Sequence, residues 1–214
     1  MRHTILIASL FLILASSPGG AFSQNRRESD QARDEIVLLT YNVRNCSGLD
    51  NITDYQRVAD IISTIKPDVV ALQELDSATL RSGKIIVLNE LALRTKLYPV
   101  FGASINYQGG KYGIGILSKE KPIRWKSLTL PGREERRSLL IAEFKGFIFC
   151  STHFSLNEED RLKSVFLAGD LNAAPGSNVI KNSKYKYTDL YNVVEKEPVA
   201  SDHLPVWVKV RIEK

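Results

Sequence analysis

The chain has 214 residues, with 29 lysines and arginines against 24 aspartates and glutamates, so its formal net charge is +5. It is 43% hydrophobic and 25% charged, a composition typical of globular proteins that excludes disordered, collagen-like and coiled-coil chains. This length favours one domain. The small positive excess permits an anionic substrate, but it is not the concentrated basic surface expected of a dedicated nucleic-acid-binding protein.

Residues 1–23 are typical of a signal peptide. A short basic start precedes an apolar run over residues 4–15, and Ala21-Phe22-Ser23 fits the small-x-small rule for cleavage before Gln24. The apolar run is shorter than the ~20 residues that span a bilayer, which favours cleavage over an uncleaved anchor. We therefore expect an exported protein, periplasmic or secreted, in which residues 24–34 form a polar, flexible leader.

The cysteine content restricts the kinds of covalent and metal site. Cys46 and Cys150 are the only cysteines, too few for a disulfide framework or a thiolate zinc site. In an oxidising compartment the two could form one disulfide. Two buried free thiols are an equally good interpretation.

From Glu35 onward, apolar strands alternate with amphipathic helices. Residues 36–43 form an apolar, β-branched run typical of a buried strand. Thr53 and Gln56 match a capping box at the start of a helix, and Pro67 ends that helix. A second buried strand over residues 68–72 completes a strand–helix–strand unit. This pattern predicts an α/β protein.

The remaining pattern predicts one more helix and several strands. Lys145-Gly146 separates two apolar runs as a hairpin turn would, so the sheets should be mixed. The glycine-rich residues 109–115 lack the ending of a phosphate loop and are interpreted as a turn into a strand. Trp125 and Trp207 lie in strand patterns and are predicted to pack in the core. The helix is expected over residues 84–96, and the strands over 112–117, 123–128, 138–144, 147–152, 165–168 and 205–212.

Polar side chains suited to metal and phosphate chemistry end four of these strands, and a fifth segment, Ser201-Asp202-His203, precedes the last strand. In open α/β sheets, ligands bind in the crevice at strand ends. Each residue alone is better interpreted as a turn or cap, but five such segments together favour a functional site. The residues are Asn42, Glu74, His153, Asp170 with Asn172, and Asp202 with His203.

These segments carry five motifs in a fixed order. They are Thr-Tyr-Asn-Val-Arg, Ala-Leu-Gln-Glu-Leu, Ser-Thr-His-Phe, Ala-Gly-Asp-Leu-Asn-Ala-Ala-Pro and Ser-Asp-His-Leu-Pro. Together they resemble the signature of the endonuclease/exonuclease/phosphatase superfamily, which includes deoxyribonuclease I and inositol polyphosphate phosphatases. The resemblance covers nearly all of residues 35–214 as one domain. It implies an α/β fold with a four-layer sandwich, in which helices flank two mixed β-sheets.

The resemblance implies a metal site. Glu74 would be the principal Mg²⁺ ligand, with Asn42 beside it and Asp202 near a shared or second metal position. Mn²⁺ is an alternative ion. Hard oxygen ligands, few protein carboxylates and room for water and phosphate are what Mg²⁺ requires.

The resemblance also implies roles in hydrolysis. Asp170 and Asn172 would orient the attacking water and hold the phosphate. His203 would be the general base or contact the phosphate, and His153 would contact the phosphate or assist the leaving group. Arg137 matches a recurring arginine with a supporting role.

The expected function is that of an exported, Mg²⁺-dependent phosphoesterase acting on a phosphodiester or phosphomonoester. Water would attack in line while the metal and a histidine assist. The substrate could be a nucleic acid, a phospholipid head group or a small phosphoester. The protein is expected to be a monomer without an obligate protein partner.

The sequence departs from the family pattern in two places. The connection between the strands that end at His153 and Asp170 lacks most of the usual helical crossover. Residues 190–200 replace a longer segment and lack the Ile-Asp pair whose aspartate orients the catalytic histidine, although Asp189 could substitute. Losing that carboxylate can cost orders of magnitude in rate. The alternative function is therefore an impaired or inactive member that binds an anionic ligand or a partner.

Overall fold

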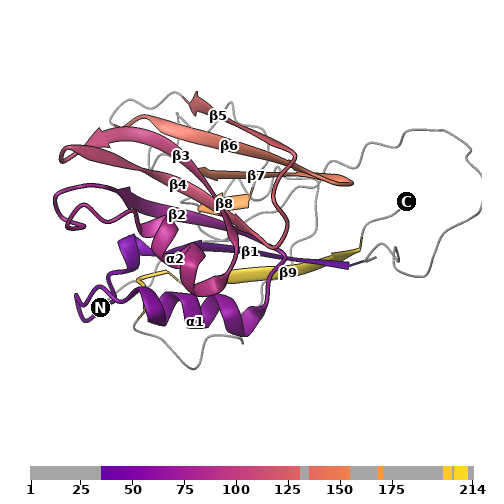
Figure 1. Ribbon diagram of the computed structural model, residues 1–214, viewed down its shortest axis with the longest axis horizontal. Coiled ribbons are helices and arrows are strands. Elements are labelled where there is room, and N and C mark those ends of the chain that lie inside the picture. Colours follow the sequence, from indigo (N-terminus) through magenta and orange to yellow (C-terminus); the bar gives the residue numbers. More distant parts are fainter. Residues whose placement is uncertain (1–34, 131–134, 155–167, 171–199, 204, 212–214) are drawn as a thin grey trace, which may run out of the picture.

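The computed structural model describes residues 35–130, 135–154, 168–170, 200–203 and 205–211. Two β-sheets pack against each other, and two helices cover the outer face of the first sheet (Figure 1). The predicted signal peptide (1–23), the leader (24–34) and Asn172 lie outside the described residues.

The first sheet has the strand order β3-β4-β2-β1-β9. Its central strands β1 and β2 are parallel, as the strand–helix–strand pattern predicts, and its other neighbours are antiparallel. Central strands covered on both faces need apolar side chains on both, which explains the continuous apolar runs of β1 and β2. The bounds are β1 Glu35–Asn42, β2 Val69–Ser77, β3 Tyr98–Tyr107, β4 Gly110–Ser118 and β9 Val206–Arg211.

The second sheet has the order β5-β6-β7-β8. The hairpin predicted at Lys145-Gly146 joins β6 to β7, with Gly146 at φ 97°, and the prediction of mixed sheets is confirmed. Strands β7 and β8 pair in parallel, with His153 opposite Asp170, and the shortened connection between them lies outside the described residues. The bounds are β5 Arg124–Leu130, β6 Arg137–Phe144, β7 Phe147–His153 and β8 Ala168–Asp170.

Helices α1 (Tyr55–Ile65) and α2 (Val87–Thr95) and the short helix η1 (Arg44–Cys46) connect strands of the first sheet. The predicted capping box was wrong by one residue, because the Asp54 carboxylate accepts the bond from the Arg57 amide at 3.0 Å. Within the described residues, helices cover only the first sheet, and none is long and apolar enough to cross a membrane.

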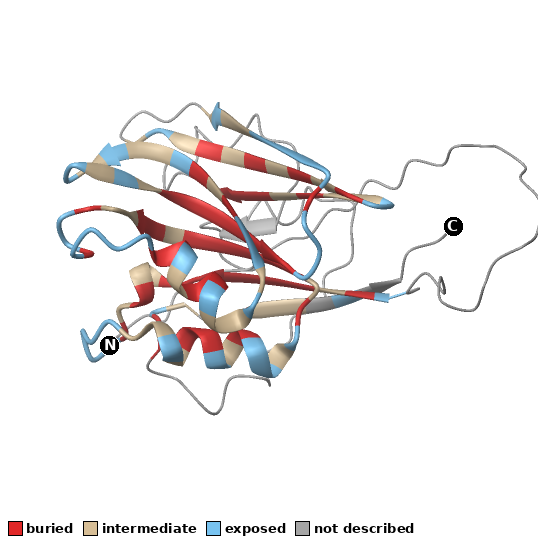
Figure 2. Cartoon of the chain, viewed as in Figure 1, coloured by how far each residue is buried: buried red, intermediate tan, exposed pale blue. Residues whose placement is uncertain are grey.

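Two apolar clusters form the core, one on each face of the first sheet. Figure 2 shows the buried residues along the strands and on the helices. Because side chains alternate along a strand, Leu38 packs between the sheets while Leu39 packs under the helices. Trp207 packs against the helix-side cluster as predicted. The prediction for Trp125 was wrong, since it is 54% exposed on the edge strand β5. Strand β3 was missing from the sequence-based prediction.

The two cysteines are free thiols. Cys46 is buried in the helix-side cluster, whereas Cys150 is half-buried in β7 of the second sheet. Of the two interpretations that the sequence left open, the structure supports free thiols.

Candidate functional site

Strand β2 carries a β-bulge at its carboxyl end, where Glu74 lies. Leu72 pairs with Gly115 and Leu75 with Gly113, so an extra residue of β2 is accommodated between them. Leu72 and Leu75 are three residues apart, yet both belong to the cluster under the helices, because a bulge resets the alternation of side chains. Glu74 takes a left-handed conformation at φ 61°, which costs a non-glycine residue about 1–3 kcal/mol. The fold therefore places this carboxylate by local backbone strain.

Asn42 ends β1 directly beside this bulge. Its side-chain Nδ2 donates to Glu74 Oε1 at 2.8 Å, and its Oδ1 accepts from the Arg44 amide at 3.1 Å. Asn42 is buried, whereas Glu74 and Arg44 are half-buried, so both bonds are partly shielded from solvent. An amide and a carboxylate thus meet at the point where the parallel pairing of β1 and β2 ends.

The segment after Asn42 is also strained. Arg44, Asn45 and Cys46 have φ values of 46°, 54° and 59°, all left-handed. Asn45 Oδ1 accepts from the Asp76 amide of β2 at 3.1 Å, which ties this turn to the bulged strand. Such strain persists only where surrounding contacts over-determine it, and it clusters at functional sites.

Ser201, Asp202 and His203 join the same network from the far end of the chain. Ser201 Oγ donates to the main-chain oxygen of Asn42 at 2.8 Å, and the His203 amide donates to Ser201 Oγ at 3.3 Å. Asp202 Oδ2 lies 3.7 Å from Arg44 Nε, and its Oδ1 lies 3.7 Å from His203 Nε2. We call Asn42, Glu74 and residues 201–203 the first-sheet rim.

The second sheet contributes Arg137 and His153, which we call the second-sheet rim. Arg137 begins β6 and His153 ends the neighbouring strand β7. Arg137 Nη1 lies 3.4 Å from His153 Nδ1 and 3.4 Å from Glu135 Oε1. In the described part of the chain, Arg137 Nε is buried and has no hydrogen-bond partner. A buried donor of this kind is costly unless a ligand or another group accepts its hydrogen bond.

Tyr112 of β4 links the two rims. Burial raises the pKa of its hydroxyl far above the ordinary value, and the nearby carboxylates of Glu74 and Glu135 raise it further. The cationic side chains of Arg81 and Arg137 act in the opposite direction. Charged groups from both sheets thus act on one hydroxyl. Sequence reasoning missed Tyr112 and Glu135, and no motif marked them.

The structure brings most of the predicted site residues together. Asn42, Glu74, Asp202 and His203 lie in one network, and Arg137 lies beside His153. Asp170 is the backbone neighbour of His153 across the β7–β8 pair, and its side chain is not described.

The donor chemistry is compatible with Mg²⁺. Among the described residues, no three histidine, cysteine, aspartate or glutamate side chains are grouped closely enough to hold a metal ion. Mg²⁺ does not require such a cage, because it keeps several waters and binds through one or two carboxylates together with substrate phosphate. The Glu74 carboxylate with the Asn42 amide fits that requirement.

The sequence matches a family model described as the endonuclease/exonuclease/phosphatase family over residues 39–190. This match includes Asn42, Glu74 and His153, while Asp202 and His203 lie beyond it. No curated protein matches the sequence significantly.

Solved structures share the fold at low sequence identity. An endonuclease/exonuclease/phosphatase from Beutenbergia cavernae has a TM-score of 0.51 and 22% identity, over 60% of this chain and 42% of that one. A functionally unknown conserved protein from Enterococcus faecalis has a TM-score of 0.50 and 16% identity, over 72% of this chain and 73% of that one. Truncated Caenorhabditis elegans TDP2 has a TM-score of 0.45 and 19% identity, over 59% and 49%. The chain thus spans about half or less of the length of the first and third of these proteins.

Proposed function

Because the chain belongs to the endonuclease/exonuclease/phosphatase family, we propose that it is a Mg²⁺-dependent phosphoesterase that hydrolyses a phosphodiester or phosphomonoester. The observation that carries this proposal is the Asn42–Glu74 pair at a strained bulge. The exported location remains part of the proposal and rests on the signal-peptide pattern of residues 1–23.

In this proposal Glu74 and Asn42 hold the metal, with Asp202 close to it. The bound ion, Mg²⁺ or Mn²⁺, supplies positive charge that stabilises the phosphoryl oxygens and the leaving oxygen as their negative charge grows. The hydrogen bond from Asn42 Nδ2 fixes the orientation of the Glu74 carboxylate, so the Glu74 side chain loses little conformational entropy when the ion binds.

Arg137 and His153 are proposed to bind the substrate phosphate. The Arg137 guanidinium lies beside His153, with Nη1 3.4 Å from His153 Nδ1, and a phosphate oxygen is an acceptor of the right charge for it. Glu135, 3.4 Å from Arg137 Nη1, helps to hold the guanidinium in place. His153 either contacts the phosphate or protonates the leaving group.

His203 is proposed as the group that accepts the proton of the attacking water. A neutral imidazole is required for that role. The Ser201 hydroxyl accepts a hydrogen bond from the His203 main-chain amide and donates one to the main-chain oxygen of Asn42. These two bonds fix the backbone of His203 relative to the Asn42–Glu74 pair. Asp170 and Asn172 keep their implied roles of orienting water and holding phosphate.

The direct test is hydrolysis of bis(4-nitrophenyl) phosphate by residues 24–214, with Mg²⁺ and with EDTA. We expect Mg²⁺-dependent release of 4-nitrophenol that EDTA abolishes. Absence of hydrolysis by folded protein at millimolar Mg²⁺, with this ester and with 4-nitrophenyl phosphate, would contradict the proposed function.

The second candidate function is that of an inactive member that binds an anionic ligand or a partner. It is favoured by the sequence of residues 190–200, which lacks the usual Ile-Asp pair. Calorimetric binding of inorganic phosphate to the same protein, without hydrolysis of either ester, would favour this second function.

A further inference from the structure

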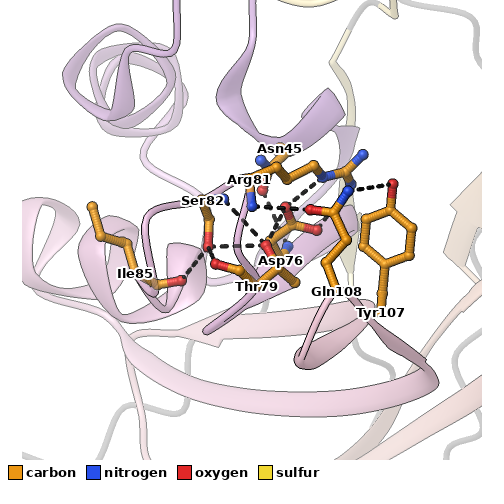
Figure 3. A network of polar contacts seen from close by, with 8 residues as sticks. All are labelled: Asn45, Asp76, Thr79, Arg81, Ser82, Ile85, Tyr107 and Gln108. Atoms are coloured by element: carbon orange, nitrogen blue, oxygen red, sulfur yellow. Dashed lines mark hydrogen bonds and ion pairs between the residues drawn. The ribbon is translucent and has the colours of Figure 1, made fainter.

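A second polar network lies beside the first-sheet rim, around Asp76 of β2 (Figure 3). Asp76 is fully buried, and Arg81 pairs with both of its oxygens, at 2.6 Å through Nε and 2.9 Å through Nη2. Thr79 Oγ1 adds a bond of 2.9 Å to Oδ2. A two-point pair with a buried carboxylate fixes the plane of the guanidinium.

Two tyrosines back this guanidinium. Arg81 Cζ lies 4.6 Å from the centroid of the Tyr107 ring and 5.5 Å from that of Tyr112. The rings come from the two strands of the β3–β4 hairpin and are 6.1 Å apart. The Arg81 side chain is nevertheless 41% exposed. Asp76 takes one edge of the guanidinium and the rings lie beside it, and part of the Arg81 side chain remains open to solvent.

The carboxylate that holds Arg81 lies on the same strand as the proposed metal ligand. Asp76 follows Glu74 by two residues in β2, and its amide donates to Asn45 Oδ1 in the turn after Asn42. Tyr112 is the β4 partner of Asp76 and interacts electrostatically with both Glu74 and Arg81. The network around Arg81 thus adjoins the part of β2 that carries Glu74.

The chemistry of this surface favours a flat, uncharged ring over a second anion. Asp76 already balances the charge of Arg81, and its carboxylate would repel an anion. A guanidinium plane stacks well on flat heterocycles such as nucleobases. Because the plane is already oriented, little side-chain entropy is lost when a ring stacks on it.

We propose that Arg81, oriented by Asp76 and backed by Tyr107 and Tyr112, is a stacking platform for a planar heteroaromatic ring attached to the substrate phosphate. This inference rests on the proposed function in one respect, since it assumes that the phosphate binds between the two rims. Under this proposal, Arg81 and Tyr107 determine which ester the protein binds.

The test compares thymidine 5′-monophosphate with 2-deoxyribose 5-phosphate, which carries a hydroxyl group in place of the nucleobase. Binding is measured by calorimetry in EDTA, so neither a metal nor turnover is needed. We expect the wild-type protein to bind the thymidine compound about tenfold more tightly, within the range that stacking on one base contributes.

Two variants separate the platform from a merely structural ion pair. Arg81→Lys keeps a cation for Asp76 but removes the plane, and Tyr107→Leu keeps an apolar support but removes the ring. Each should reduce the preference for the thymidine compound to less than threefold while leaving binding of 2-deoxyribose 5-phosphate unchanged. Arg94→Lys is the matched control, because Arg94 also pairs with a carboxylate and lies over a tyrosine, on helix α2. It should change neither affinity.

Equal binding of the two compounds by the wild-type protein would overturn the platform. So would variants that weaken both compounds equally. If the wild-type protein hydrolyses no ester but shows the ring preference in EDTA, the platform holds and the proposed catalysis fails. If it hydrolyses esters but shows no preference, only the platform fails.

Discussion

The two rims of the candidate site are built in different ways. On the first sheet, Glu74 lies in a left-handed conformation at a bulge, beside a left-handed turn over Arg44–Cys46. On the second sheet, Arg137 and His153 occupy ordinary strand ends, and the pairing of β7 with β6 and β8 is regular. The difference teaches that the proposed metal-binding carboxylate is positioned by strain, which neighbouring contacts must balance, whereas the proposed phosphate-binding residues need only a regular sheet.

The largest expected effect concerns Glu74. Glu74→Gln should lower Mg²⁺-dependent hydrolysis roughly a thousandfold, because metal stabilisation of the developing charge is worth several kcal/mol. The melting temperature should hardly change, since glutamine keeps the same backbone strain and can still accept the Asn42 bond. Steady-state rates and thermal unfolding measure both.

Glu143→Gln is the matched control, because Glu143 pairs with Arg124 on the exposed edge of the second sheet. It should leave the rate unchanged. Retention of more than a tenth of the activity by the Glu74 variant would remove Glu74 from the metal site.

Substitutions in the second-sheet rim should lower activity less than the substitution of Glu74 in the first-sheet rim. Arg137→Lys retains the cation but loses the guanidinium beside His153, and we expect kcat/KM to fall about tenfold, as for loss of one charged hydrogen bond. Arg124→Lys is the control on the neighbouring strand. Unchanged kcat/KM in the Arg137 variant would show that its guanidinium does not contact the substrate.

The bulge should depend on the packing beneath it. A Cβ at Gly115 would come within 2.7 Å of Leu75 Cδ1 and 2.8 Å of Leu88 Cδ1. Gly115→Val should therefore lower the free energy of unfolding by about 1–3 kcal/mol, and Gly115→Ala by less. Urea denaturation measures both. Unchanged stability in the valine variant would mean that the bulge shifts without cost, contrary to the strain described for Glu74.

The smallest expected effect concerns the alkylation of the two cysteine thiols, Cys46 and Cys150. Burial raises the pKa of Cys150 to about 11 and that of Cys46 further still. At pH 8 both thiols are therefore protonated, and iodoacetamide should label neither in the folded protein. Labelling of Cys150 should rise about tenfold per pH unit until its pKa is reached. Mass spectrometry after unfolding without reductant should find two labelled thiols, and none would indicate a disulfide.

Much of the architecture was predictable from the sequence because it follows from periodicity. Apolar runs and turn residues indicated the β1–α1–β2 unit and the β6–β7 hairpin. Strand β3 was not predicted because apolar and polar residues alternate little along it. Glycine and tyrosine lie among both its inward-facing and its outward-facing positions. Trp125 was misplaced because a strand pattern does not reveal which strand lies at a sheet edge.

The site was predictable only at the level of motifs. Asn42 and Glu74 stand out because each follows an apolar run with a polar side chain, and His203 stands out in a Ser-Asp-His motif just before the last strand. The left-handed conformation of Glu74 leaves no trace in the sequence, since nothing about a glutamate indicates positive φ. The pairing of Asp76 with Arg81 was equally hidden, because it depends on a loop that returns to the strand and on tyrosines from another hairpin.

The central claim is that the strained bulge at Glu74 creates a metal site, and Mn²⁺ binding tests it most directly. Electron paramagnetic resonance titration counts free and bound Mn²⁺ in the wild-type protein and in Glu74→Gln. We predict saturable binding that Mg²⁺ displaces in the wild-type protein and that is lost in the variant. Equal Mn²⁺ binding by the two proteins would contradict the claim.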